Sequence, residues 1–222
     1  MELDRYFQEI VQTFGPPSGG RPASPETLEA MAGRVPQSLH DFWALHGFGI
    51  WHDGLFQLCD PVRYRPIAKA IFGSDSDIRA GSTYLIGMSA FGRLMFWNQP
   101  HRIVEANVLS LHVYAAHLFR PKPNIPPEIT IGTALFGTND SVHDGYDADG
   151  NGMFARARKA FGPLKFDQIY APKLHPALGG ALQLDNFRPA SALEALALAA
   201  QAGPFELIDN SELPPKMVRQ IG

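Results

Sequence analysis

The stretch DADGNGMFARAR, residues 147–158, holds residue types that could bind a metal ion. Four of its residues match positions 1, 3, 5 and 6 of an EF-hand calcium loop: Asp147, Asp149, Asn151 and Gly152. Position 12 of such a loop is a bidentate glutamate, but here it is Arg158, and a cation there opposes Ca²⁺ binding. We therefore expect no metal ion. The alternative is a turn built from good turn formers, with an acid or Asn near residue 151 capping the next helix.

The same loop is strongly acidic. Residues 139–155 contain no Lys or Arg, and they contain four acids: Asp140, Asp144, Asp147 and Asp149. These four negative charges repel one another and do not stabilise the loop. Together they create a negative field that attracts a basic partner. We predict that these aspartates, with Tyr146, form a partner-binding surface. A solvated loop whose charge is partly neutralised by the cations at 156, 158 and 159 is the alternative.

The histidines do not have the spacing of a metal site. His40, His46 and His52 lie six residues apart, which places no two of them on one face of a helix. We therefore expect scattered packing or surface residues. An enzyme whose site gathers distant residues, such as His52, Asp53 and His112, is kept as an alternative.

Nucleophile and cofactor motifs are also missing from the sequence. Cys59 ends an apolar segment with no polarising neighbour in view, which predicts a buried thiol. Ser89 lies in GMSAFG, which does not match the G-x-S-x-G turn of hydrolases. No glycine-rich phosphate-binding loop occurs. We expect no catalytic residues and no cofactor, which favours a protein that acts by binding.

Composition narrows the class of protein. The chain has 222 residues, of which 45% are hydrophobic and 18% charged, as in globular proteins. The net charge of −3 argues against direct binding to nucleic acid. One cysteine rules out an internal disulfide and favours a reducing compartment. The N-terminal segment does not have the pattern of a secretory signal, and no apolar run is long enough for a membrane span. We expect a cytoplasmic protein.

The periodicity of apolar residues predicts an α+β fold. Helices are expected over 2–13, 25–33, about 36–46, about 61–72, 153–161 and 190–203, the last of them ended by Gly203. Asp53-Gly54 predicts a hairpin, and residues 82–115 an antiparallel meander. The expected architecture is N-terminal helices plus this meander, with a smaller α+β C-terminal part packed against it. The polar tail NSELPPKMVRQIG is expected to be mobile or loosely docked.

The proline-rich segment RPKPNIPPE, residues 120–128, is the best candidate for a domain boundary. It divides the chain into residues 1–120 and residues 128–222. The sequence leaves open whether the two halves are separable domains or share one core.

Several segments together resemble a bacterial protein family. They are FGPP at 14–17, VPQSLHDFWALHGFGIWHDGLFQLCDPVRY at 35–64, AFGRLMFWN at 90–98 and MFARARKAFGPLKFDQIYAPKLHPALGG at 153–180. In this order they are similar to a GAD-like domain, over residues 1–120, joined to a Tdi-type C-terminal domain, over residues 128–222. His175 and Pro176 depart from the apolar stretch expected before ALGG.

This resemblance implies a noncatalytic immunity protein. Its expected partner is a cognate DNase toxin delivered by type VI secretion, which the immunity protein binds and neutralises. Because a DNase must hold DNA, its active site is expected to be basic, which fits an acidic inhibitor surface. A generic interaction or regulatory module of the same fold, with another partner, is the alternative.

Overall fold

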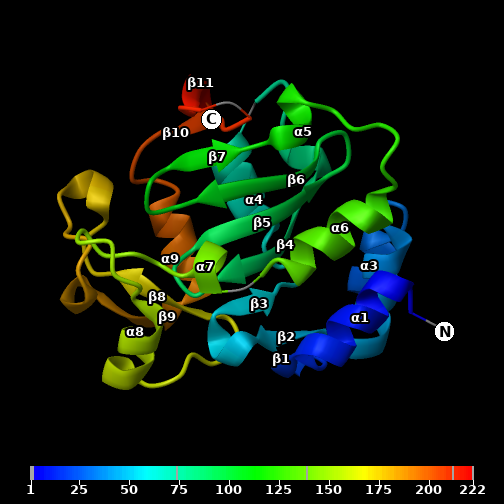
Figure 1. Cartoon of the computed structure of the whole chain (residues 1–222), viewed down its shortest axis with the longest axis horizontal. Coiled ribbons are helices and arrows are strands. Elements are labelled where there is room, and N and C mark those ends of the chain that lie inside the picture. The colour runs from blue at the N-terminus through cyan, green and yellow to red at the C-terminus, as the bar shows by residue number, and fades with distance from the viewer. Residues whose placement is uncertain (1–2, 74, 139, 212, 222) are drawn as a thin grey trace.

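A nine-stranded sheet forms the centre of the computed structural model (Figure 1), which describes residues 3–73, 75–138, 140–211 and 213–221 but not the side chains at 140 and 141. The strand order is β1-β2-β3-β4-β5-β6-β7-β10-β11, and neighbours are antiparallel except for β7 and β10, which are parallel. The strands are β1 (Ser18–Arg21), β2 (Phe48–Trp51), β3 (Phe56–Leu58), β4 (Thr83–Ser89), β5 (Arg93–Asn98), β6 (Arg102–Asn107), β7 (His112–Tyr114), β10 (Phe205–Asp209) and β11 (Lys216–Ile221). A separate hairpin pairs β8 (Gln168–Pro172) with β9 (Phe187–Ser191).

The helices occur before, between and after these strands. They are α1 (Arg5–Phe14), α2 (Pro25–Met31), α3 (Gln37–His46), α4 (Arg65–Phe72), α5 (Ala116–Phe119), α6 (Pro127–Phe136), α7 (Asp140–His143), α8 (Phe154–Phe161) and α9 (Ala192–Ala199). Their starts follow local chemistry: Asp4 caps α1, and Ser24 caps α2 ahead of Pro25. The α+β class, the N-terminal helices and the antiparallel meander are confirmed. The helix expected from about residue 61 begins later, at Arg65.

Helices cover both faces of the sheet. On one face, α4 and α9 pack over a cluster that includes Phe72, Phe96, Leu196 and Phe205. On the other, α1, α3 and α6 cover a second cluster, rich in aromatic side chains, at the β2–β5 end of the sheet. The first cluster joins residues from both sides of the proline-rich segment: β10 pairs directly with β7, and α9 packs against α4. The division into residues 1–120 and 128–222 remains a prediction.

The expectation of a mobile or loosely docked tail is wrong for residues 216–221; residues 212 and 222 of that tail lie outside the described residues. Residues 216–221 form β11, which pairs with β10 at the edge of the sheet. Arg219 holds the strand in place through ion pairs with Asp75 and with Asp77, the latter at 2.7 Å. The carboxylates lie in the turn after α4, about 140 residues earlier in the chain, so the sequence near the tail carries no sign of them.

No helix among the described residues is both long enough and apolar enough to span a bilayer.

Candidate partner-binding site

The acidic loop, defined here as residues 140–149, is folded around the carboxylate of Asp147. This side chain is 2% exposed. Its Oδ1 accepts hydrogen bonds from the backbone N–H of Asp149 at 3.1 Å and of Asn151 at 2.8 Å, and also from the Asn151 side chain. Its Oδ2 accepts from Arg156 at 2.5 Å. The Arg156 hydrogen bond, with the backbone N–H of Asn151 and Asp149, holds the pKa of Asp147 below its usual range.

Asp144 links the acidic loop to the next helix. Its Oδ1 accepts a hydrogen bond from the backbone N–H of Phe154, the first residue of α8, at 2.9 Å. The cap therefore comes from ten residues upstream and not from an acid or Asn near residue 151. Gly152 makes this approach possible, because a Cβ there would lie 2.6 Å from the Asp144 carboxylate.

These contacts use the groups that a calcium loop would need for its ion. Asp147 is already paired with Arg156. Arg158, at position 12, forms an ion pair with Asp53 at 3.2 Å. Within the described part of the chain, no cluster of three or more His, Cys, Asp or Glu side chains could hold a metal ion. The loop is thus a turn held by the carboxylate of Asp147.

The outer surface of the acidic loop presents a different set of side chains. Tyr146 is 48% exposed, and Val142, on α7, is 42% exposed. Asp149 is exposed, and its carboxylate accepts a hydrogen bond from Gln183 at 3.4 Å. The side chain of Asp140 lies outside the described residues. The loop thus combines one acid directed to solvent, a partly buried Asp144 and two apolar or aromatic groups.

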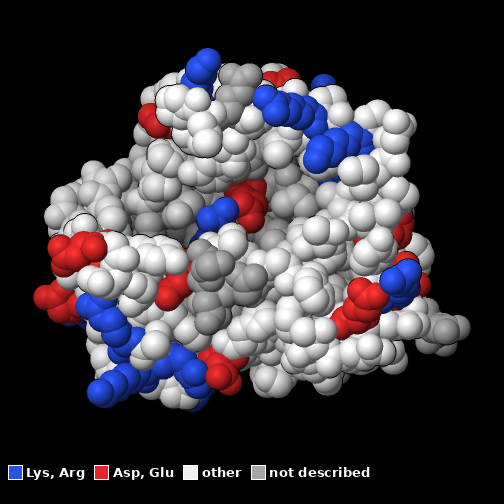
Figure 2. Space-filling view, in the orientation of Figure 1, with Lys and Arg blue, Asp and Glu red and all other residues white. Residues whose placement is uncertain are grey.

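A cavity of about 500 Å³ opens between the acidic loop and the sheet. Tyr146 and Val142 line it from the loop, and Phe91 lines it from the turn between β4 and β5. Gly145 brings the loop close to Phe91, since a Cβ on this glycine would lie 2.7 Å from the ring. Figure 2 shows a hollow near the middle of this face, with basic and acidic side chains on its floor.

Arg93 and Glu105 form an ion pair next to this cavity. Nη2 of Arg93 donates to Oε2 of Glu105 at 2.6 Å. Nη1 of the same guanidinium donates to the carbonyl of Val142 at 3.3 Å, which ties α7 to the sheet. Sequence reasoning missed Arg93, Glu105 and Val142. Glu105 and Val142 are 12 and 49 residues away from Arg93 in the chain, so only the fold brings the three together.

The scattered residues of the enzyme alternative are not gathered into one site. His52 contacts Thr138 at 3.2 Å, and Asp53 pairs with Arg158. His112 lies on β7, where it contacts Tyr114 and Glu206.

Cys59 is a buried thiol, as expected from the sequence. Burial raises its pKa well above the usual value, and the nearby carboxylates of Asp167 and Asp60 raise it further. A thiol in this state stays protonated and is a poor nucleophile.

Family comparisons agree with this arrangement of segments. Residues 5–110 match the model of the GAD-like domain. Residues 139–202 match the model of the C-terminal domain of the type VI secretion immunity protein Tdi1. No curated protein matches the chain.

A solved structure extends the comparison to nearly the whole chain. The crystal structure of Atu4351 from Agrobacterium tumefaciens is 36% identical in sequence and superposes with a TM-score of 0.94. The match covers 97% of this chain and 98% of Atu4351. The chain therefore belongs to the GAD-like and Tdi-type family of type VI secretion immunity proteins.

Proposed function

We propose that this protein acts in the cytoplasm, without catalysis, by binding and neutralising a cognate DNase toxin delivered by type VI secretion. The proposed contact surface is the acidic loop together with the cavity behind it. The observation that carries this proposal is that the Tdi1-type match, residues 139–202, contains both the loop and the exposed Tyr146.

Electrostatics supports the choice of a nuclease as the partner. A protein that holds DNA exposes basic groups where the phosphates lie. Asp149, together with the half-buried Asp144, presents negative charge on one side of the acidic loop. Asp147 acts differently: it is enclosed and neutralised by Arg156, so it shapes the loop and adds little to the outer field. Long-range attraction of this kind raises the rate of association and weakens with salt.

Charge alone does not provide the affinity that neutralisation needs. Nanomolar binding corresponds to about −12 kcal/mol, and such interfaces usually depend on a few desolvated anchors. Tyr146 and Val142 stand at the mouth of the cavity with nearly half of their surface exposed. We expect Tyr146 to be the principal anchor, because tyrosine is enriched among residues whose truncation costs most at interfaces.

The test is a plasmid-degradation assay with the product of the adjacent gene. Equimolar addition of this chain should abolish its nuclease activity. If the neighbour degrades no DNA, or degrades it equally well when this chain is present, the proposed function is wrong.

Substitutions then test the surface. Asp144→Asn/Asp149→Asn removes two charges and keeps an oxygen at residue 144 to accept the Phe154 N–H. The matched control is Glu9→Gln/Glu29→Gln, which removes two exposed acids on α1 and α2.

We expect the loop variant to bind at least tenfold more weakly at low salt and the control to bind like wild type. Tyr146→Ala should weaken binding by a similar factor that does not depend on salt, because it removes an apolar contact. Equal affinities for the loop variant, Tyr146→Ala and wild type would place the interface elsewhere.

A further inference from the structure

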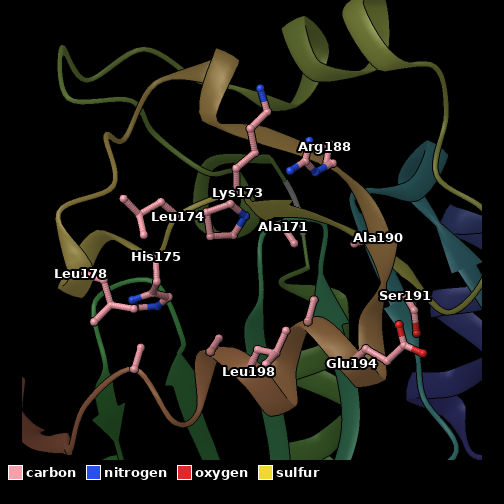
Figure 3. Close-up of a pocket in the computed structure, with 14 residues that line it drawn as sticks. Ala171, Lys173, Leu174, His175, Leu178, Arg188, Ala190, Ser191, Glu194 and Leu198 are labelled. Carbon is pink, nitrogen blue, oxygen red and sulfur yellow. The ribbon is translucent and has the colours of Figure 1, made fainter.

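A second hollow lies between α9 and the β8–β9 hairpin, and we call it the α9 groove (Figure 3). Its volume is about 380 Å³, within the range of sites that take a ligand or a few side chains. Alanines from both walls form its floor: Ala171 and Ala190 on the hairpin, and Ala195 and Ala199 on α9. Methyl groups are too short to fill the space between a helix and a hairpin, which leaves the groove open.

Exposed leucines surround the α9 groove. Leu198 on α9 is 72% exposed, and Leu178 and Leu174, in the turn after β8, are 61% and 47% exposed. Figure 3 shows Leu174 and Leu178 on one side of the groove and Leu198 on the helix across from them. The three exposed leucines surround one hollow, so they form an apolar patch and are not isolated surface residues.

Two cations mark one end of the same groove. Lys173 and Arg188 extend from the hairpin wall, away from α9 (Figure 3). Neither side chain forms an ion pair within the described part of the chain. Glu194 lies on α9 on the opposite side, near Ser191. This asymmetry gives an occupant a direction, with its carboxylate toward Lys173 and Arg188 and away from Glu194.

The α9 groove is continuous with the surface proposed for the toxin. Residues 173–183 separate the two: Leu178 lines the groove, and Leu182 lines the cavity behind the acidic loop. The backbone N–H of Ala148 donates to the carbonyl of Leu182 at 2.8 Å, so the acidic loop and this segment lie side by side. A partner that covers the acidic loop would need to extend only across one turn of chain to reach the groove.

We infer that the α9 groove is a second docking site for the same protein partner. It takes a segment that places an aliphatic side chain over the alanine floor and a carboxylate beside Lys173 and Arg188. The inference rests on the proposed function, since the partner is the toxin that the acidic loop binds. The two sites have opposite charge, so a partner surface must be basic in one place and acidic and apolar in the other. That pairing would discriminate between cognate and non-cognate toxins.

The test measures the affinity of full-length variants for the nuclease encoded beside this chain. Lys173→Glu/Arg188→Glu reverses the charge at the groove, and its control, Arg5→Glu/Lys69→Glu, makes the same change in net charge on α1 and α4. Leu198→Ser removes an exposed apolar group, and its control is Leu45→Ser, at a leucine that is 53% exposed on α3. All these positions are exposed, so each variant should fold.

We expect both groove variants to bind at least tenfold more weakly than wild type, and both controls to bind like wild type. Hydrogen exchange in the complex should show protection of residues 173–178 and 192–199. If the acidic-loop variants lose affinity while the groove variants keep it, the groove inference alone is wrong. If wild type does not neutralise the nuclease, the proposed function and the inference both fail. Dimers of the chain alone that the groove variants dissociate would assign the groove to a second copy and would also overturn the inference.

Discussion

His175 holds residues 173–183, the segment between the acidic loop and the α9 groove, through two hydrogen bonds of its ring. Replacing it should destabilise the protein by an amount that these contacts predict. The ring is 8% exposed. Its Nε2 donates to the carbonyl of Val108 at 2.7 Å, and its Nδ1 accepts from the backbone N–H of Ala177 at 3.1 Å. The second bond caps the short 3-10 helix Pro176–Leu178. One neutral tautomer, with the proton on Nε2, satisfies both contacts.

The structure sets the size of the effect for His175→Ala. A buried carbonyl that loses its partner costs about 1–3 kcal/mol. A lost N-terminal cap costs about 1 kcal/mol. We expect the free energy of unfolding to fall by about 3 kcal/mol, and the melting temperature to fall by about 6–12 °C for a chain of this length.

Two further variants at His175 separate the contacts. His175→Gln keeps a nitrogen donor near the position of Nε2 and loses the cap, whereas His175→Asn keeps an acceptor near the position of Nδ1 and loses the bond to Val108. Each should cost about 1–2 kcal/mol in a urea titration with an unchanged slope. The reasoning is refuted if His175→Ala costs less than about 1 kcal/mol, or if Gln and Asn are each as damaging as Ala.

Three other perturbations test the remaining structural conclusions. Arg219→Ala should lower the free energy of unfolding by about 2 kcal/mol and speed hydrogen exchange in β11, because the enclosed Asp75 loses its cation; unchanged exchange would show that the ion pair does not hold the strand. The pKa of Asp147 is lowered by the hydrogen bond from Arg156, so the stability it provides is present above the normal carboxyl range and is lost as pH falls through its folded pKa. Acid titration from about pH 5 to about pH 2, the range over which carboxyl groups titrate, should therefore destabilise wild type more than Asp147→Asn, and parallel curves would contradict this. A chelator should leave the melting temperature unchanged, because Arg156 pairs with Asp147 and because position 12 of the calcium-like loop is the cation Arg158; a drop in melting temperature would show that a metal binds there.

Local signals in the sequence predicted much of the fold. The Ser24-Pro25 pair, the Asp53-Gly54 turn and the alternation in residues 82–115 act over a few residues, and each produces the element expected of it. The start of α4 was misplaced, because Asp60-Pro61 forms a turn before the helix: Asp60 accepts hydrogen bonds from the N–H groups of Val62 and Arg63.

The docking of the tail and the geometry of the site could not be predicted from the sequence, because both depend on contacts between residues that are distant in the chain. No pattern in KMVRQI indicates that its arginine meets two carboxylates in the turn after α4. The acidic loop was found from its charge, but charge counting could not show that Asp147 faces inward. The α9 groove could not be predicted from the sequence either, because its walls are the β8–β9 hairpin and α9, which meet only in the folded chain. His175 stood out in the sequence, and its contact with Val108 now explains why a polar ring sits in an apolar stretch.

Because β7 pairs with β10, one edge of β7 stays unpaired while the chain between the two strands is synthesised. β7 ends at Tyr114 and β10 begins at Phe205, so the ribosome must add about 90 residues before β7 gains its second neighbour. At typical rates of about 5–20 residues per second, that edge stays open for roughly 5–20 s. The segment that matches the Tdi1 C-terminal domain emerges within this interval, between two strands that later lie side by side. A nascent chain must therefore protect the unpaired edge of β7 until β10 has docked against it.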